Sequence, residues 1–225
     1  MKRMRKIVFS IVISLFVLGC GSKKGSATGT KSTTEINLSA LLSESIPPIT
    51  DTAKIKRFVM LVAPRAFRDE ELKIPYELLT KIGHKITVAS RDTVIAIGVL
   101  GLAVKPQITV KDIDTLKYDG LILVGGTGAA IYWDDSVVHQ FARYFARTPN
   151  KIVAAICLAP VTLARAGVLA GKKATVYEDK STIADLTKGG AQYEKTDVVI
   201  SGNIITASGP QAAEKFAKAI ALSVR

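Results

Sequence analysis

The stretch KIVAAICLAP, residues Lys151–Pro160, joins two patterns at one cysteine. Its apolar run Ile152–Ile156 is typical of a short buried strand. Apolar residues at helical spacing begin at Val161, so the chain has to turn sharply at Cys157. Such a turn lifts the cysteine toward solvent and points the first N–H groups of the helix at it, which favours the thiolate. The alternative is a buried, unreactive cysteine, because free cysteines are common in protein cores.

Strands and helices alternate on both sides of this stretch. Apolar strands that alternate with helices imply a mainly parallel sheet with helices on both faces. We therefore predict one α/β domain over residues 56–225, built as a three-layer αβα sandwich. The predicted strands are 57–63, 85–89, 119–124, 151–157, 174–177, 198–201 and 204–207, the predicted helices are 68–82, 135–147, 161–170, 180–188 and 210–224, and 94–110 is predicted as a hairpin excursion.

Three segments are expected at one edge of this sheet. Cys157, the pair Gly125-Gly126 and the loop after Ala63 all follow the carboxyl ends of predicted strands, where open parallel sheets place their sites. The loop carries acids at 69–71, one of which can turn inward to the thiol. A carboxyl there would be protonated, with its own pKa raised and that of the cysteine lowered. The alternative is a helix start that carries acids on its surface.

Six pieces of the domain follow one another in a characteristic order and spacing. They are ELKIP at 71–75, GHKITVAS at 83–90, YDGLILVGG at 118–126, AAICLAP at 154–160, LARAGVLAGKKAT at 163–175 and ITASGP at 205–210. In this order and spacing, the pieces resemble the ThiJ/PfpI superfamily, also called the DJ-one/PfpI family, over residues 58–222. The resemblance implies a flavodoxin-like fold, akin to class I glutamine amidotransferases. Family members are often dimers, so a homodimer is a further expectation.

The resemblance also implies roles for individual residues. Carried over by position, Cys157 is the nucleophile and Glu71 is the acid that hydrogen-bonds it. Backbone amides of Gly126 and Leu158, with Gly125 beside them, form the oxyanion pocket. Aromatic residues near these positions are candidate pocket walls, with ordinary packing as the alternative. They are Tyr132, Trp133 and Tyr177.

The sequence departs from the family pattern in its histidines. PfpI-type peptidases have a histidine directly after the cysteine, where this chain has Leu158, and DJ-one-type proteins have one after the next strand, where this chain has Tyr177. Of the two histidines present, His84 is expected on the surface at a helix–strand turn, while His139 is a candidate for the rim. Without a Cys–His pair, a cysteine peptidase is the least favoured function.

The function that the resemblance implies is a cofactor-free, metal-free enzyme of the glyoxalase III or deglycase type. Its substrate would be a small reactive dicarbonyl, such as methylglyoxal, or a protein modified by one. Cys157 would add to the aldehyde, and Glu71 would shuttle the proton. The alternative is a non-catalytic module that senses oxidants or protects proteins, since a reactive cysteine beside a carboxyl oxidises readily.

The N-terminus predicts export and anchoring. A basic start, Met1–Lys6, precedes the apolar segment Ile7–Gly19, which is too short to span a bilayer comfortably. VLGC at 17–20 resembles the lipobox of bacterial lipoproteins, which implies removal of residues 1–19 and lipidation of Cys20. Residues 20–55 would then tether the domain to a membrane of the bacterial cell envelope, facing the periplasm or the exterior. An uncleaved anchor and an ordinary signal peptide are the alternatives.

The positive charge of the chain is concentrated before the domain. Of 31 basic and 19 acidic residues, 8 and 3 precede residue 56, which leaves 23 and 16 and reduces the balance from +12 to +7. The remaining charges are scattered without aromatic interleaving, so we expect no nucleic-acid partner. A basic surface near anionic lipid is the simpler explanation.

Overall fold

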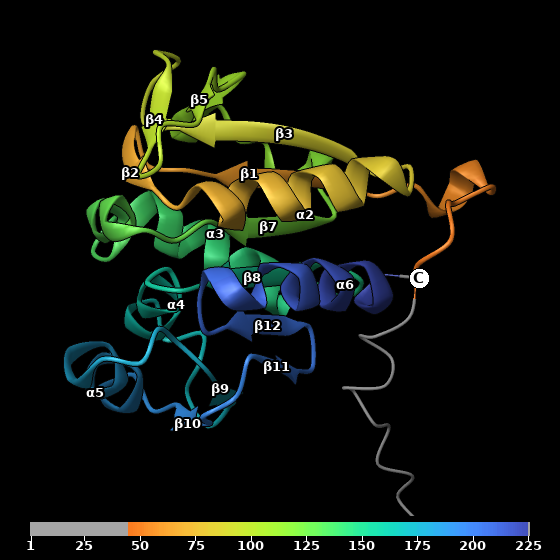
Figure 1. Ribbon diagram of the computed structural model, residues 1–225. Coiled ribbons are helices and arrows are strands. Elements are labelled where there is room, and N and C mark those ends of the chain that lie inside the picture. The colour runs from red at the N-terminus through yellow and green to blue at the C-terminus, as the bar shows by residue number, and fades with distance from the viewer. Residues whose placement is uncertain (1–44, 225) are drawn as a thin grey trace, which may run out of the picture. The chain divides into compact units, whose positions relative to one another are not determined.

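The computed structural model describes residues 45–224 (Figure 1). The predicted signal segment, Cys20 and the tether up to residue 44 lie outside these residues. The helices are α2 (Asp69–Lys81), α3 (Ser136–Arg147), α4 (Pro160–Arg165), α5 (Lys180–Lys188) and α6 (Ala213–Ser223). The strands are β1 (Arg57–Leu61), β2 (Arg65–Phe67), β3 (Lys85–Ser90), β4 (Ala96–Gly98), β5 (Ala103–Val104), β6 (Ile108–Thr109), β7 (Gly120–Leu123), β8 (Ile152–Ile156), β9 (Lys173–Ala174), β10 (Gln192–Tyr193), β11 (Val198–Ser201) and β12 (Ile204–Ala207).

The main sheet has seven strands in the order β11-β12-β8-β7-β1-β3-β6. Its neighbouring strands run parallel, except for the antiparallel hairpin β11–β12. The chain leaves β1 toward β3 and later returns to the other side of β1 as β7, so the topological switch point lies between β1 and β7. Ligand sites in such sheets lie beyond the carboxyl ends of the strands at this point.

Alternate residues of β1 face opposite layers, as expected for a strand that is covered on both sides. Phe58 and Met60 belong to a buried cluster with residues of α2 and α6. Val59 and Leu61 belong to a second cluster with residues of α3, α4 and α5. Figure 1 shows α2 and α6 side by side across one face of the sheet. The predicted three-layer α/β sandwich is confirmed.

Some element boundaries differ from those predicted from the sequence, and others match. The predicted helix after Cys157 was extended to residue 170, but α4 stops at Arg165 because Gly167 adopts a left-handed conformation with φ 72°. The strand predicted at 174–177 is reduced to β9, which pairs with the unpredicted β10. The predicted helix at 180–188 and the strands of the 198–207 hairpin match the structure.

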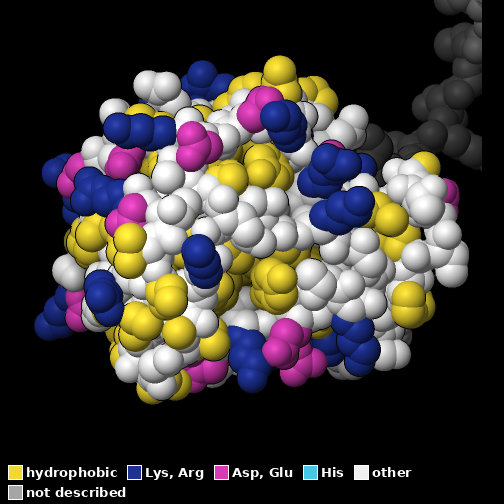
Figure 2. Space-filling model, turned by 90° about the horizontal axis from the view of Figure 1, so that it is seen from above, with side chains coloured by type: hydrophobic (Ala, Val, Ile, Leu, Met, Phe, Trp, Pro, Cys, Tyr) yellow, Lys and Arg dark blue, Asp and Glu magenta, His cyan; other side chains and the backbone are white. Residues whose placement is uncertain are grey.

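Residues 94–110 contain the predicted hairpin, formed by the antiparallel pair β4–β5, and continue into β6 at the edge of the main sheet. β2 extends the hairpin into a small three-stranded sheet. The face in Figure 2 carries basic and acidic side chains interspersed with hydrophobic ones. Within residues 45–224, no helix has both the length and the apolar character needed to cross a membrane.

Candidate active site

Cys157 lies directly after β8, on the turn into α4, where the sequence predicted it. Its backbone is left-handed, with φ 63°, which costs a non-glycine residue about 1–3 kcal/mol. Two main-chain hydrogen bonds hold it there: Cys157 N–H donates to the Ala207 carbonyl at 2.9 Å, and Tyr177 N–H donates to the Cys157 carbonyl at 2.9 Å. The surrounding strands therefore maintain a strained conformation at the cysteine.

Glu71 is the third residue of α2, and its side chain is completely buried. Oε2 accepts a hydrogen bond from the Gly125 amide at 3.1 Å. Oε1 is buried without a hydrogen bond of normal geometry, although the Cys157 thiol is close enough to interact with the carboxyl. Pro75 lies four residues later and has no N–H, so it cannot donate the helical hydrogen bond to the Glu71 carbonyl. The structure thus brings together the acid and the cysteine that the resemblance paired.

The two glycines after β7 allow these groups to meet. A Cβ on Gly125 would lie 2.5 Å from both Glu71 Oε2 and the Ile156 carbonyl oxygen, and 2.6 Å from Cys157 Cβ. Gly126 has φ 92°, and a Cβ there would lie 2.4 Å from the Arg68 amide nitrogen. Neither position has room for a side chain.

Two of the three predicted oxyanion donors contact the sulfur. The amides of Gly126 and Leu158 both hydrogen-bond the Cys157 side chain and favour its ionised form. The Gly125 amide does not belong with them, because it donates to Glu71 instead. Gly125 therefore orients the acid, and Gly126 and Leu158 are the two expected donors whose amides face the Cys157 side chain.

Burial controls the protonation of the pair. It raises the pKa of Glu71 to about 8, against opposing hydrogen bonds from Cys157 and Gly125, so the carboxyl keeps its proton at neutral pH as expected. Burial, followed by the negative charge that Glu71 carries once it has ionised, also raises the pKa of the Cys157 thiol to about 12. The expectation of a solvent-lifted thiolate is therefore wrong for this state. The cysteine is only 6 % exposed, and desolvation outweighs the helix dipole and the two amides.

The three candidate wall residues have different surroundings. Trp133 is half-buried, and its indole N–H donates to the Leu158 carbonyl at 3.0 Å. Tyr177 is 47 % exposed and contacts the cysteine through its main chain. Tyr132 is only 3 % exposed, and its hydroxyl donates to the Val62 carbonyl at 3.0 Å. Tyr132 is therefore a packing residue rather than a pocket wall.

The histidines do not supply the base that the sequence lacks. His139 Nε2 hydrogen-bonds the Trp133 carbonyl at 2.7 Å. His84 is buried, which contradicts the surface position expected for it, and packs edge-on against Phe58. Its Nδ1 accepts from the Lys56 amide, at the amino-terminal edge of the sheet and away from Cys157. The titratable partner of the thiol is a carboxyl. Among the described residues, no three His, Cys, Asp or Glu side chains are grouped to hold a metal ion.

A cysteine on a strand–helix turn, met by a buried carboxyl and two backbone amides, defines a cysteine-elbow protein built on a parallel α/β sheet. The family model of the DJ-1/PfpI family matches residues 56–222, and the chain belongs to this family. The match covers the whole parallel sheet and the site.

Similar proteins carry enzyme names. Deglycase PfpI of Pyrococcus furiosus is 30% identical over 153 residues, which cover 68% of this chain and 90% of the relative. Glutathione-independent glyoxalase DJR-1.2 of Caenorhabditis elegans is 26% identical over 162 residues, covering 72% and 85%. The crystal structure of a ThiJ/PfpI domain protein from Brachyspira murdochii matches with a TM-score of 0.72 at 28% identity, covering 76% and 96%. The relatives support a DJ-1/PfpI-type enzyme.

Proposed function

We propose that the protein is a cysteine-dependent, cofactor-free enzyme that acts on reactive dicarbonyls, as a glyoxalase or a deglycase. The observation that carries the proposal is the fully buried Glu71 carboxyl, which contacts the Cys157 thiol and, because burial raises its pKa to about 8, keeps its proton at neutral pH. The names of the deglycase and glyoxalase relatives favour the same chemistry.

In the first step, Cys157 Sγ adds to the aldehyde carbon and forms a C–S bond. The thiol proton passes to one oxygen of Glu71, and the proton already on Glu71 passes to the carbonyl oxygen, which becomes a hydroxyl. The product is a hemithioacetal, and the carboxyl ends as it began. The amides of Gly126 and Leu158 stabilise the charge that develops on the oxygen.

The two activities differ in how the hemithioacetal forms. For a deglycase, the former aldehyde carbon carries a hydroxyl and the protein amine, so Cys157 Sγ displaces the amine, which leaves with the thiol proton by way of Glu71, and the same hemithioacetal results. In both cases the proton on the carbon that bears sulfur then moves to the neighbouring carbonyl carbon, and the hydroxyl proton moves to its oxygen, giving a thioester. Water hydrolyses the thioester to a hydroxy acid and frees the thiol. Glu71 is placed to move the proton in either case.

Methylglyoxal consumption without glutathione tests the proposal. The purified protein should convert methylglyoxal to lactate, Cys157→Ala should abolish this activity, and Glu71→Gln should reduce it by about 10²–10⁴-fold. Cys20→Ser is the matched control, because it removes the other cysteine and should leave turnover intact. Full activity in Cys157→Ala would refute the assignment of the nucleophile. Absence of activity on both methylglyoxal and a methylglyoxal-modified peptide would refute the proposed function.

An oxidant-responsive role is the second candidate, favoured by the carboxyl in place of a histidine beside the thiol. Its weakness is the raised pKa of Cys157, because oxidants react with the thiolate. Peroxide treatment followed by intact-mass measurement distinguishes the two. Rapid addition of two oxygen atoms at Cys157, in a protein that does not consume methylglyoxal, would favour the sensor.

A further inference from the structure

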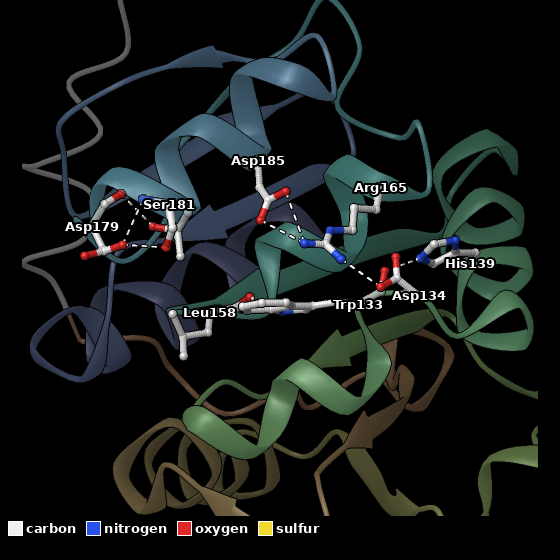
Figure 3. Close-up of polar contacts among 9 residues, drawn as sticks. Trp133, Asp134, His139, Leu158, Arg165, Asp179, Ser181 and Asp185 are labelled. Atoms are coloured by element: carbon white, nitrogen blue, oxygen red, sulfur yellow. Dashed lines mark hydrogen bonds and ion pairs between the residues drawn. The ribbon is translucent and has the colours of Figure 1, made fainter.

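Arg165, at the end of α4, links three parts of the chain near the site (Figure 3). Its Nη1 lies 2.8 Å from Asp134 Oδ2, and its Nη2 lies 3.0 Å from Asp185 Oδ2. Its Cζ lies 5.1 Å from the centre of the Trp133 ring, within the range of a cation–π contact. Arg165 therefore fixes the indole with respect to α4 and α5.

Trp133 transmits this restraint toward the nucleophile. Its Nε1–H donates to the Leu158 carbonyl at 3.0 Å, and its own carbonyl accepts a hydrogen bond from His139 Nε2 at 2.7 Å. Figure 3 shows the indole lying between Leu158 and the Arg165 guanidinium. The side chain of Trp133 thus contacts the residue that directly follows Cys157.

The turn at Cys157 depends on contacts from outside it, because its left-handed backbone is strained. Two of these contacts come from the main chain of Ala207 and Tyr177. The bond from Trp133 comes from a side chain, so a substitution can remove it while the peptide backbone stays intact. The Leu158 amide shares its peptide unit with the Cys157 carbonyl, which Tyr177 holds, and the Leu158 carbonyl belongs to the next peptide unit. Loss of the Trp133 bond therefore loosens the amide through the backbone dihedrals of Leu158, which set the angle between the two units.

We propose that Arg165 is a positioning residue, which acts through Trp133 to keep the Leu158 amide directed at Cys157. The effect of Arg165 on catalysis rests on the proposed function. The contacts of Arg165 and Trp133 do not depend on it. Exposed ion pairs alone contribute little to stability, whereas Arg165 binds two carboxylates and covers an aromatic face at once. Lysine cannot reproduce this combination, because its ammonium group is a single point charge.

The test uses the full chain with Cys20→Ser, in which Cys157 is the remaining cysteine and Trp133 is the one tryptophan. Arg165→Met, Arg165→Lys and Trp133→Phe are compared with Arg143→Met. Arg143 is a matched control because it bonds the Ala166 carbonyl, next to Arg165, at 3.2 Å. The readouts are the rate of Cys157 alkylation by iodoacetamide at pH 8 and Trp133 fluorescence before and after alkylation.

Arg165→Met and Trp133→Phe should each slow alkylation by roughly threefold to tenfold, since loss of the Leu158 amide leaves less thiolate. Arg165→Lys should fall between these variants and the parent, while Arg143→Met should match the parent. The double variant Arg165→Met/Trp133→Phe should be alkylated no more slowly than either single variant, because both substitutions break the same series of contacts. Alkylation should change Trp133 fluorescence in the parent and much less in Arg165→Met.

An unchanged or faster alkylation rate in folded Arg165→Met, or effects of the two substitutions that add, would overturn the inference. If Arg165→Met does not fold, Trp133→Phe decides, because it keeps an aromatic ring and loses the N–H. An alkylation rate equal to that of the parent would then overturn the inference. Alkylation and fluorescence need no substrate. A parent that consumes no methylglyoxal but shows Arg165-dependent alkylation would refute the proposed function and support the positioning role.

Discussion

Glu71 keeps its proton because it is buried, and this has a consequence for stability. In the unfolded chain its pKa returns to about 4.5, whereas in the folded protein it is about 8. Below pH 4.5 Glu71 is protonated in both states, so its ionisation costs the folded protein no stability. Between pH 4.5 and 8 only the unfolded state releases the proton, so the free energy of unfolding falls as pH rises. Above pH 8 both states are ionised and the loss is complete.

Glu71→Gln should remove this loss. The free energy of unfolding of the wild-type protein, relative to Glu71→Gln, should fall by a few kcal/mol between pH 5 and pH 8, at about 1.4 kcal/mol per pH unit at most. Urea denaturation at both pH values measures the difference. Glu77→Gln is the control, because Glu77 lies on the same helix, is largely exposed and pairs with Lys73. A difference between wild type and Glu71→Gln that does not vary with pH would contradict the raised pKa.

At the scale of residues, local pattern predicted the position of Cys157 but not its protonation. An apolar run that stops at a cysteine before a helix requires a sharp turn, and the turn is where expected. The pKa of the thiol depends on how much protein covers it, which no local pattern records. For the same reason, the sequence did not predict that the Gly125 amide donates to Glu71, because the two residues are 54 positions apart in the chain.

At the scale of elements, one acid connects α2 to the hairpin β4–β5. Asp69, two residues before Glu71, is nearly buried and accepts hydrogen bonds from the amides of Leu100 at 2.8 Å and Leu102 at 2.7 Å. A Cβ on Gly98 would lie 2.4 Å from the Asp69 carboxylate. The start of the helix that carries Glu71 is therefore also the anchor of the hairpin.

Asp69→Ala should loosen the hairpin, because it leaves two backbone donors without their acceptor. The expected cost is about 1–3 kcal/mol for each donor that stays buried. Amide hydrogen exchange should accelerate at Leu100 and Leu102 more than in the strands of the main sheet. Asp92→Ala is the control, since Asp92 caps only the exposed Val94 amide. Unchanged protection at Leu100 and Leu102 would show that the carboxylate does not hold the hairpin.

Elements with strong periodicity were predictable, and contacts between distant elements were not. Apolar spacing and a two-residue turn gave α5 and the β11–β12 hairpin their observed positions. The cluster around Arg165 gave no signal in the sequence, because Asp134 and Asp185 lie 31 and 20 residues from it. Ion pairs of this kind are decided by how the helices pack.

At the scale of the whole molecule, the order of strands and helices was enough to predict a parallel sheet and the edge at which the site lies. The burial of the Cys157 sulfur depends on how several elements pack around it, so the sequence did not predict it. The expected homodimer stays a prediction.

We propose that the chain is anchored to a membrane through lipid on Cys20, on the strength of the VLGC sequence at 17–20. The wild-type protein should therefore fractionate with membranes and gain the mass of acyl chains. Cys20→Ser removes the thiol that would carry the acyl chains, and stable anchoring needs more than one such chain. The variant should therefore move to the soluble fraction or remain unprocessed. Cys157→Ser is the control and should remain with the membranes. A soluble wild-type protein without added mass would contradict the anchor.

The left-handed backbone at position 157 makes the presence of a thiol there costly for the stability of the fold. Glycine would accept that conformation without strain, so the sequence that best tolerates heat at this position has no sulfur there. Selection for durability alone would erase the thiol. A cysteine that persists at this position across related chains would be a sign of use, and its replacement by glycine would mark lineages in which the chemistry has been abandoned.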